Sequence, residues 1–311
     1  MSQPAGLLPE GMTSPHDFVE ALERHGYLAD LGLGTACYLG LTLSRPLFLE
    51  GEPGVGKTEV AKTLARLLQA PLIRMQCYEG IDVSQALYDW DFPRQLLHLR
   101  SIETVAGIGG GKWTDVDSVE GELYDRRFLI PRPLLQALET TPSVLLVDEV
   151  DRADDEFEAF LLEVLSDFTV SIPEIGTVHA DTPPVVVVTS NRTREVHDAL
   201  KRRCLYHWLD HPSFDREVAI VRMRLPHASE RLTEQVTAAV QALREADLVK
   251  PPGVAETLDW TQALVALGAE ELDAELMALT LGSVLKYHED QERARTLDFA
   301  TLPGVQPAAG R

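Results

Sequence analysis

Cysteines and long apolar runs are scarce in this 311-residue sequence. The three cysteines, Cys37, Cys77 and Cys204, lie far apart and do not have the spacing of metal ligands. We expect all three to be buried as small apolar residues, in a chain that works in the reducing cytoplasm. No apolar run approaches the length of a membrane span, and residues 185–188 are long enough only for a strand. Residues 1–12 have no basic segment and no apolar core, so we expect no signal peptide.

Basic residues are also scarce, since 28 lysines and arginines stand against 49 aspartates and glutamates. The net charge of −21 at pH 7 disfavours non-specific binding to DNA, RNA or anionic membranes. We therefore expect neither nucleic acid nor a membrane as a partner. Hydrophobic residues make up 45% of the chain, which is enough for a sizeable core. The length suits a large α/β domain with a smaller second domain.

Apolar strands alternate with helices as far as residue 210. We expect strands at 46–50, 72–75, 144–147, 185–188 and 205–209, a hairpin at 170–178, and helices at 57–69, 133–139 and 155–167. Because these strands are apolar on both faces, they fit a mostly parallel sheet that is covered by helices. After Pro212 the strand signals stop, and residues 214–224, 233–248, 257–267 and 272–287 each have a helical pattern.

These patterns predict an α/β chain in which a parallel-sheet core precedes a small all-helical domain. The predicted boundaries are a flexible N-terminal arm at 1–13, the core at 14–210, the helical domain at 211–300 and a tail at 301–311. Within the core, the regular pattern weakens at residues 78–125. The glycines at 107–111 and the acidic residues that follow them suggest a flexible insertion there.

A phosphate-binding motif follows the first predicted strand. Residues 51–58, GEPGVGKT, match the pattern GxxxxGK[ST] in full, between a buried strand and an amphipathic helix. Glycines let the backbone approach phosphate oxygens closely, and the helix directs its positive end at them. Lys57 should reach the β- and γ-phosphates, and the Thr58 hydroxyl should ligate Mg²⁺. The residues expected to bind ATP are Gly51, Glu52, Pro53, Gly54, Val55, Gly56, Lys57, Thr58 and Glu59.

Two acidic residues follow the apolar strand at 144–147, at the strand end where ligands bind in open α/β sheets. Asp148 would hold Mg²⁺, directly or through water, and Glu149 would act as the general base on the attacking water. Alone, the pattern also fits two acids that cap a strand at the surface. The complete phosphate-binding motif at 51–58 favours the catalytic interpretation.

The two motifs together resemble those of AAA+ ATPases, and further segments resemble the MoxR family and its CoxD-like branch. These segments are DEVDRA at 148–153, FEAFLLE at 157–163, PEIGT at 173–177, TSNRTR at 189–194, ALKRRCLYHW at 199–208, YEG at 78–80, YDW at 88–90 and PRQLL at 93–97. The resemblance covers about residues 15–290, and its 189–208 part is highly specific. It implies an AAA+ core followed by a helical lid, and ATP hydrolysis coupled to protein remodelling.

The resemblance also implies partners. We expect a homo-oligomeric ring, a hexamer, an adaptor protein with a von Willebrand A (VWA) domain, and a metalloenzyme client of the molybdenum hydroxylase class. Asn191 is similar to sensor 1, which orients the attacking water, although an asparagine in a turn is the plain alternative. Arg203, with Arg202 beside it, is similar to the arginine finger that completes a neighbouring subunit's site; the alternative is a solvated basic turn. Such fingers contribute on the order of 10³-fold or more to turnover.

One residue of the family pattern is missing. The family usually carries a sensor 2 arginine at the start of a lid helix, and the matching residues 256–260 contain none. Arg244 and Lys250 are candidate substitutes that nothing in the sequence distinguishes. This absence favours an alternative function, a nucleotide-gated binding switch with little turnover. The net charge disfavours a nucleic-acid motor, and a small-molecule kinase would need no finger acting in trans.

The predicted insertion matches in position the helix-2 insert of the family, a candidate for contacts with clients. Trp90 and Trp113 could be exposed there, and packing of both against the core is the plainer expectation. The acidic residues around 151–158 should mostly form the solvated face of a helix; they are Asp151, Asp154, Asp155, Glu156 and Glu158.

Overall fold

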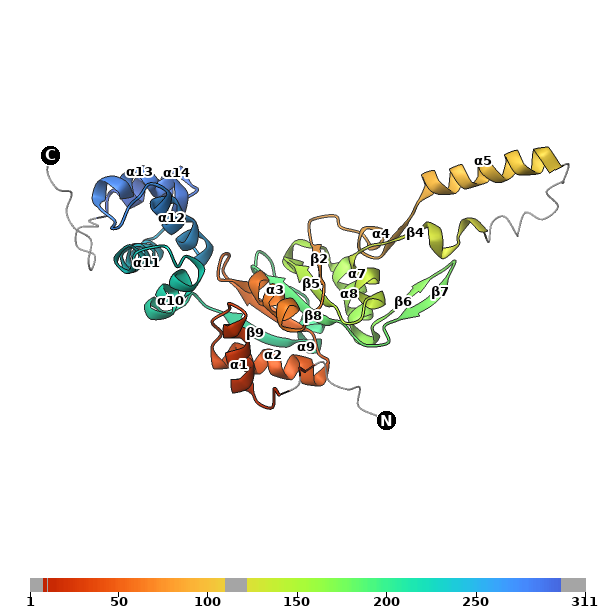
Figure 1. The fold of residues 1–311 in the computed structure, drawn as a ribbon, viewed down its shortest axis with the longest axis horizontal. Coiled ribbons are helices and arrows are strands. Elements are labelled where there is room, and N and C mark those ends of the chain that lie inside the picture. Colours follow the sequence, from red (N-terminus) through yellow and green to blue (C-terminus); the bar gives the residue numbers. More distant parts are fainter. Residues whose placement is uncertain (1–7, 10, 110–121, 298–311) are drawn as a thin grey trace. The chain divides into compact units, whose positions relative to one another are not determined.

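The computed structural model describes residues 8–9, 11–109 and 122–297 (Figure 1). The chain divides into two compact units, each built from segments that are distant in sequence. The first unit contains Ala36–Phe48 and Leu64–Tyr206, and the second contains Met12–Thr35, Leu49–Thr63 and the residues from His207 onward. The domain boundaries predicted from the sequence stay a prediction.

A five-stranded parallel sheet forms the centre of the fold, in the strand order β2-β5-β8-β1-β9. The strands are β1 (Leu47–Gly51), β2 (Leu72–Gln76), β5 (Val144–Asp148), β8 (Val185–Ser190) and β9 (Leu205–Leu209). Every residue of β1, β5 and β8 is buried, which explains their continuous apolar runs. The register pairs Val144 of β5 with Leu72 of β2 and with Val185 of β8. The predicted α/β class with a parallel sheet is therefore confirmed.

Helices pack against this sheet in the first unit. The core of the unit joins side chains of β5 and β8 to α7 (Pro133–Glu139), α8 (Asp155–Asp167) and α9 (Asp198–Arg203). The expected hairpin is present as β6 (Thr169–Ile172) and β7 (Gly176–His179), which pair antiparallel. The expected helix at 57–69 is α3 (Lys57–Leu67), and α2 is at Leu31–Leu43. All three cysteines are buried, as predicted.

Residues 78–109, where the sequence pattern weakens, contain regular elements that the sequence did not predict. This segment contains α4 (Val83–Ala86), β3 (Tyr88–Trp90) and the 18-residue helix α5 (Phe92–Gly109). After a short 3₁₀ helix at Arg126–Phe128, β4 (Leu129–Pro131) pairs antiparallel with β3. The apolar residues at the start of α5 are exposed, 61% for Phe92 and 66% for Leu97, so they do not follow the pattern of a buried helix face.

Trp90 is buried and packs edge-on against Tyr88 and Tyr124, which lie in the same segment, so it is not an exposed aromatic residue; its packing against the core stays a prediction. Trp113 lies outside the described residues.

The second unit is rich in helices. It contains α1 (Pro15–Arg24), α10 (Phe214–Arg224), α11 (Glu230–Glu245), α12 (Val254–Ala266), α13 (Ala274–Val284) and α14 (His288–Arg295). Ser14 and Asp17 form a capping box at the start of α1. Trp260 is fully buried in a cluster contributed by α11 to α14. The predicted helix at 272–287 is shorter than expected, and α14 was not predicted. Among the described residues, no helix is long and apolar enough to cross a membrane.

Candidate nucleotide site

The phosphate-binding loop links β1 to α3 and lies in the second unit. Gly54 and Gly56 have φ values of +81° and +101°, a left-handed conformation that glycine adopts without strain. The buried Lys57 ammonium donates to the carbonyls of Gly51 and Glu52, both at 2.7 Å. The backbone N–H of Glu59 donates to Gly56 O at 3.1 Å, so the loop passes directly into the helix. Residues 51–59 thus form one continuous loop and helix start, with the geometry of an anion site.

The start of α12 is joined to this loop. Val254 N donates to Gly54 O at 3.0 Å. A Cβ atom at Gly253 would lie 2.7 Å from the Cα of Gly54, closer than side chains tolerate. The two glycines therefore allow the backbones of the loop and of α12 to touch.

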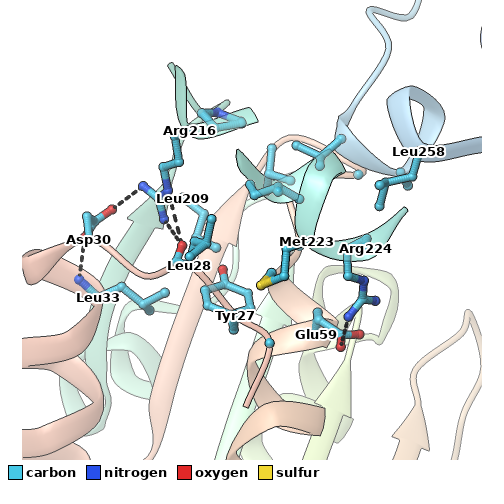
Figure 2. Close-up of a pocket in the computed structure, with 18 of the residues that line it drawn as sticks. Tyr27, Leu28, Asp30, Leu33, Glu59, Leu209, Arg216, Met223, Arg224 and Leu258 are labelled. Atoms are coloured by element: carbon cyan, nitrogen blue, oxygen red, sulfur yellow. Dashed lines mark hydrogen bonds and ion pairs between the residues drawn. The ribbon is translucent and has the colours of Figure 1, made fainter. Parts of the chain in front are cut away.

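A pocket of about 200 Å³ adjoins the loop within the second unit (Figure 2). Its apolar wall comes from several elements and includes Leu28, Leu209, Ile220, Met223 and Leu258. Tyr27 and the glycines of the loop also line it. A flat apolar base next to phosphates is the kind of ligand that such a wall and loop accommodate.

Two arginines of α10 line the same pocket. The Arg216 guanidinium donates to Leu28 O at 2.6 and 3.2 Å and pairs with Asp30 at 3.1 Å. Arg224 pairs with Glu59 at 3.2 Å. Figure 2 shows the contacts of both arginines as dashed lines. Arg216 thus connects α10 to the segment that follows α1.

Asp148 lies at the end of β5 in the first unit and is only 3% exposed. Its Oδ1 accepts a hydrogen bond from Thr189 Oγ1 at 2.6 Å. Its Oδ2 accepts two bonds from Arg74, at 2.6 Å from Nη2 and 3.0 Å from Nε. Carboxylate oxygens are the ligands that Mg²⁺ prefers in proteins. Among the described residues, no cluster of three or more His, Cys, Asp or Glu side chains could hold a metal alone. A Mg²⁺ ion here would need phosphate oxygens or waters as well, which is the usual way in which this ion is bound.

Glu149 and Asn191 contact each other. Asn191 Nδ2 donates to Glu149 Oε1 at 3.1 Å, while Gln76 and Arg152 bind Oε2 at 3.1 and 2.7 Å. The Glu149 backbone has φ +56°, and its N–H donates to Thr189 Oγ1 at 2.9 Å. Thr189 therefore connects the two acidic residues, because it binds Asp148 and Glu149 together.

The acidic residues that follow do not all face solvent. Asp151 is 2% exposed and accepts bonds from the backbone N–H groups of Asn191 and Thr193, at 3.2 and 2.8 Å. Glu158 is also buried, pairs with Arg194 and accepts a bond from His197 N at 2.7 Å. The prediction of a solvated face was therefore wrong for these two residues, which hold the segment after β8 in place. Asp154, Asp155 and Glu156 are exposed, as expected.

The two candidate finger residues lie at the end of α9. Arg203 is exposed, and its guanidinium donates to Ser166 Oγ on α8. The Arg202 side chain makes a long, exposed ion pair with Asp198, at 3.8 Å. The Arg45 side chain donates to the carbonyls of both arginines and thereby fixes the end of the helix. Within the described part of the first unit, neither arginine contacts Asp148 or Glu149, which is compatible with action on another subunit.

Sequence reasoning missed four residues around these acids: Arg74, Gln76, Asp151 and Thr189. Arg74 and Gln76 were visible as polar residues at alternate positions of β2, a spacing that directs them to one face of the sheet. Thr189 follows four valines directly, so it marked the end of the buried part of its strand.

A protein-family model described as the AAA domain of the dynein-related subfamily matches residues 46–204, just over half of the 311 residues. The chain belongs to this AAA family. The matched region includes the phosphate-binding loop, both acidic residues at the end of β5, Asn191 and Arg203. Proteins of this family hydrolyse nucleotides, generally use ATP with Mg²⁺, and typically assemble into rings.

Solved structures are similar to this AAA protein at low identity. The Holliday junction branch migration motor RuvB of Thermotoga maritima is 17% identical, with a TM-score of 0.45 over 89% of this chain and 72% of that chain. A form of the same motor with a single substitution is 16% identical, with a TM-score of 0.47 over 89% and 72% of the two chains. No curated protein matches the chain.

Proposed function

We propose that this AAA protein hydrolyses ATP in a homo-oligomeric ring, with Glu149 as the general base. The observation that carries this proposal is the contact between Asn191 Nδ2 and Glu149 Oε1 at 3.1 Å, at the ends of two neighbouring buried strands. A carboxylate and an amide in direct contact can both bind one water molecule that lies beside them, and can orient it for attack on a phosphorus atom. Asp151 supports the arrangement, because it fixes the backbone N–H of Asn191.

The remaining roles follow from the chemistry of each group. Lys57 and the backbone of residues 51–56 bind the phosphates, while Thr58 and Asp148 are the groups that would hold Mg²⁺. That ion would neutralise charge on the phosphates. Thr189 keeps one oxygen of Asp148 oriented through its 2.6 Å hydrogen bond. Glu149 accepts a proton from the water as the water oxygen bonds to the γ-phosphorus, and the bond from that phosphorus to the bridging oxygen breaks, so that ADP and phosphate leave.

Arg203 is proposed to act in trans. Its exposed position at the end of α9 would let it reach a nucleotide bound by a neighbouring subunit, where a cation stabilises the charge that develops during phosphoryl transfer. Arg45 fixes the backbone that presents Arg203. Arg202, with its weak exposed ion pair, is the second candidate.

The proposed cellular role is that of a MoxR-type remodeller of the CoxD-like branch. In this role the ring, a hexamer, would act in the cytoplasm with a VWA-domain adaptor and mature a metalloenzyme of the molybdenum hydroxylase class. The segments at 148–153 and 189–208 support the proposal through their resemblance to that family. The mostly exposed apolar start of α5, with Phe92, Leu96 and Leu97, supports a role of the insertion in binding proteins.

A second candidate function is a nucleotide-gated switch with little turnover. It is favoured by α12, whose residues Val254–Ala266 include no arginine that could sense the nucleotide. Arg244 does not offer an obvious substitute, because its guanidinium is bound to the buried Glu217 at 2.6 and 2.7 Å.

The rate of ATP hydrolysis per subunit, measured against protein concentration, separates the two functions. Wild type should become steeply more active as the concentration rises, whereas Glu149→Gln should stay at background while still binding ATP. Arg203→Gln should be inactive, and Arg202→Gln should retain most activity.

Mixing Glu149→Gln with Arg203→Gln subunits should restore part of the activity, because one interface in the mixed ring then combines an intact base with an intact finger. If wild type never exceeds Glu149→Gln, the hydrolysis proposal fails for the isolated chain and the switch remains. If the mixture stays inactive, Arg203 does not act in trans.

A further inference from the structure

Helix α10 presents two arginines to the nucleotide pocket, and their surroundings differ. Arg216 is committed to the fold, since it holds a backbone carbonyl and the Asp30 carboxylate. Arg224, one residue from the pocket-lining Met223, is 40% exposed in its side chain and has one partner within the described part of the chain, Glu59. Figure 2 shows its guanidinium directed toward Glu59 at the edge of the pocket. Arg224 can therefore change partner without disturbing the packing of the helix.

The partner of Arg224 lies beside the phosphate-binding motif. Glu59 is the third residue of α3, directly after Lys57 and Thr58, and its N–H bonds to Gly56 of the phosphate-binding loop. The positive end of the helix stabilises this carboxylate, but it also attracts the phosphates of a nucleotide. A phosphate bound there would be repelled by Glu59 and attracted by Arg224. An arginine prefers a phosphate because its planar guanidinium can donate two parallel, charge-assisted hydrogen bonds to it.

We propose that Arg224 breaks its ion pair with Glu59 and binds the phosphates of the nucleotide instead. Helix α10 then senses whether the pocket is occupied. The inference rests on the proposed nucleotide-binding function and names a phosphate-binding residue outside the motif at 51–58. It supplies from α10 a cation that α12 does not contain. Because Glu59 and Arg224 connect α3 to α10, the change of partner would alter the contact between the phosphate-binding loop and the lid helices.

The other cations of the lid are less suited to this role. Arg244 donates through Nε to Pro252 O at 2.7 Å and through both terminal nitrogens to Glu217, so its donors are used. Lys250 is exposed, and its backbone is bound to Asp290 on α14. Neither residue lines the pocket, whereas Arg224 does.

The test is a titration of the full-length chain with fluorescent N-methylanthraniloyl-ADP. Arg224→Gln should weaken binding about tenfold, which corresponds to about 1.4 kcal/mol. Arg222→Gln is the matched control, because Arg222 lies two residues earlier on α10, pairs with the exposed Glu234 at 2.9 Å and does not line the pocket. The control should bind within about twofold of wild type. Arg224→Lys should recover part of the lost affinity, since it restores the charge without the two parallel donors.

A double variant separates a direct contact from a charge effect on Glu59. If Arg224 touches the phosphates, Arg224→Gln should still weaken binding several-fold when Glu59→Gln is already present. If the double variant binds the nucleotide with the same affinity as Glu59→Gln alone, Arg224 only neutralises the charge of Glu59, and the proposal is overturned. Equal affinities of Arg224→Gln and wild type would overturn it as well.

Failure of the proposed nucleotide-binding and hydrolysis function would give a different result from failure of the Arg224 proposal. Wild type that binds no nucleotide would overturn both the proposed function and this inference. Wild type that binds but does not hydrolyse would remove only the hydrolysis proposal, and the comparison between Arg224 and Arg222 would still decide this one. The thermal unfolding midpoint of each variant is the control for folding. Midpoints equal to that of wild type would show that a loss of affinity does not come from a loss of fold.

Discussion

Replacement of Arg244 by methionine should destabilise the helical part of the second unit far more than replacement of an ordinary surface arginine. Glu217 on α10 is fully buried, and its carboxylate accepts bonds from two terminal nitrogens of Arg244 at 2.6 and 2.7 Å. Thr257 of α12 adds a third bond at 2.6 Å. Arg244→Met removes two of these three bonds and leaves a buried negative charge without a counter-charge.

The expected cost is about 3–5 kcal/mol, the range for a buried ion pair that loses one partner. This is a large part of the roughly 5–15 kcal/mol that stabilise a typical domain. Arg222→Met serves as the control, because its pair with Glu234 is exposed on both sides, at 44% and 55%, and should contribute at most about 1 kcal/mol. The double variant Arg244→Met with Glu217→Leu removes both charges and should recover most of the loss.

Urea unfolding followed by tryptophan fluorescence measures these differences. Trp260 is fully buried on α12, and its indole N–H bonds to Thr280 at 2.7 Å, so its emission should change when the helices separate. Far-UV circular dichroism gives a second probe of the same transition. If Arg244→Met costs no more than Arg222→Met, the Glu217 carboxylate does not depend on Arg244, and the reasoning is refuted. A double variant as unstable as the single one would also refute it, since the cost would then come from packing and not from charge.

Three further predictions concern the catalytic cluster, the response to pH and the thiols. Asn191→Ala should lower the rate of ATP hydrolysis about 100-fold with little change in nucleotide affinity, and an unchanged rate would show that the amide does not orient the water. Burial lowers the pKa of His207 and His211 below 6.5, so the unfolded chain binds protons more readily than the folded one. The free energy of unfolding should therefore be fully retained above pH 6.5 and decrease as the pH falls below that value. Urea titrations at pH 7.5 and 5.5 measure the decrease, and His211→Gln should reduce it. Burial also raises the pKa of the Cys77 thiol to about 12, so at pH 8 this thiol should react with Ellman's reagent at least about 100-fold more slowly in the native chain than in urea.

The sequence was informative where function depends on neighbouring residues. The phosphate-binding loop is defined by glycines, a lysine and a threonine within eight positions, and Asp148 and Glu149 follow a run of four apolar residues. Each motif includes its own structural context, a buried strand before the polar residues, and the five strands of the parallel sheet lie where they were expected. A parallel sheet could therefore be predicted from local patterns alone.

Contacts between distant segments could not be predicted in this way. Arg74 reaches Asp148 because β2 and β5 are neighbours with Gln76 opposite Asp148, and that register is a property of the folded sheet. Asp151 was expected in a mostly solvated acidic run, yet it is buried and bound to the turn that carries Asn191 and Thr193. Helix α5 was missed because its apolar residues do not mark one buried face, so its amphipathic signal is weak.

The close approach of Gly54 and Gly253 has a consequence for any attempt to divide the protein into smaller parts. A fragment that ends after β9 would contain every residue of the phosphate-binding motif, yet it would lack the N–H of Val254 that binds Gly54 O. The loop in such a fragment would lose a backbone partner that comes from about two hundred positions further along the sequence. A minimal nucleotide-binding fragment should therefore extend through α12, and substitutions at Gly253 should impair nucleotide binding as seriously as substitutions within the motif itself.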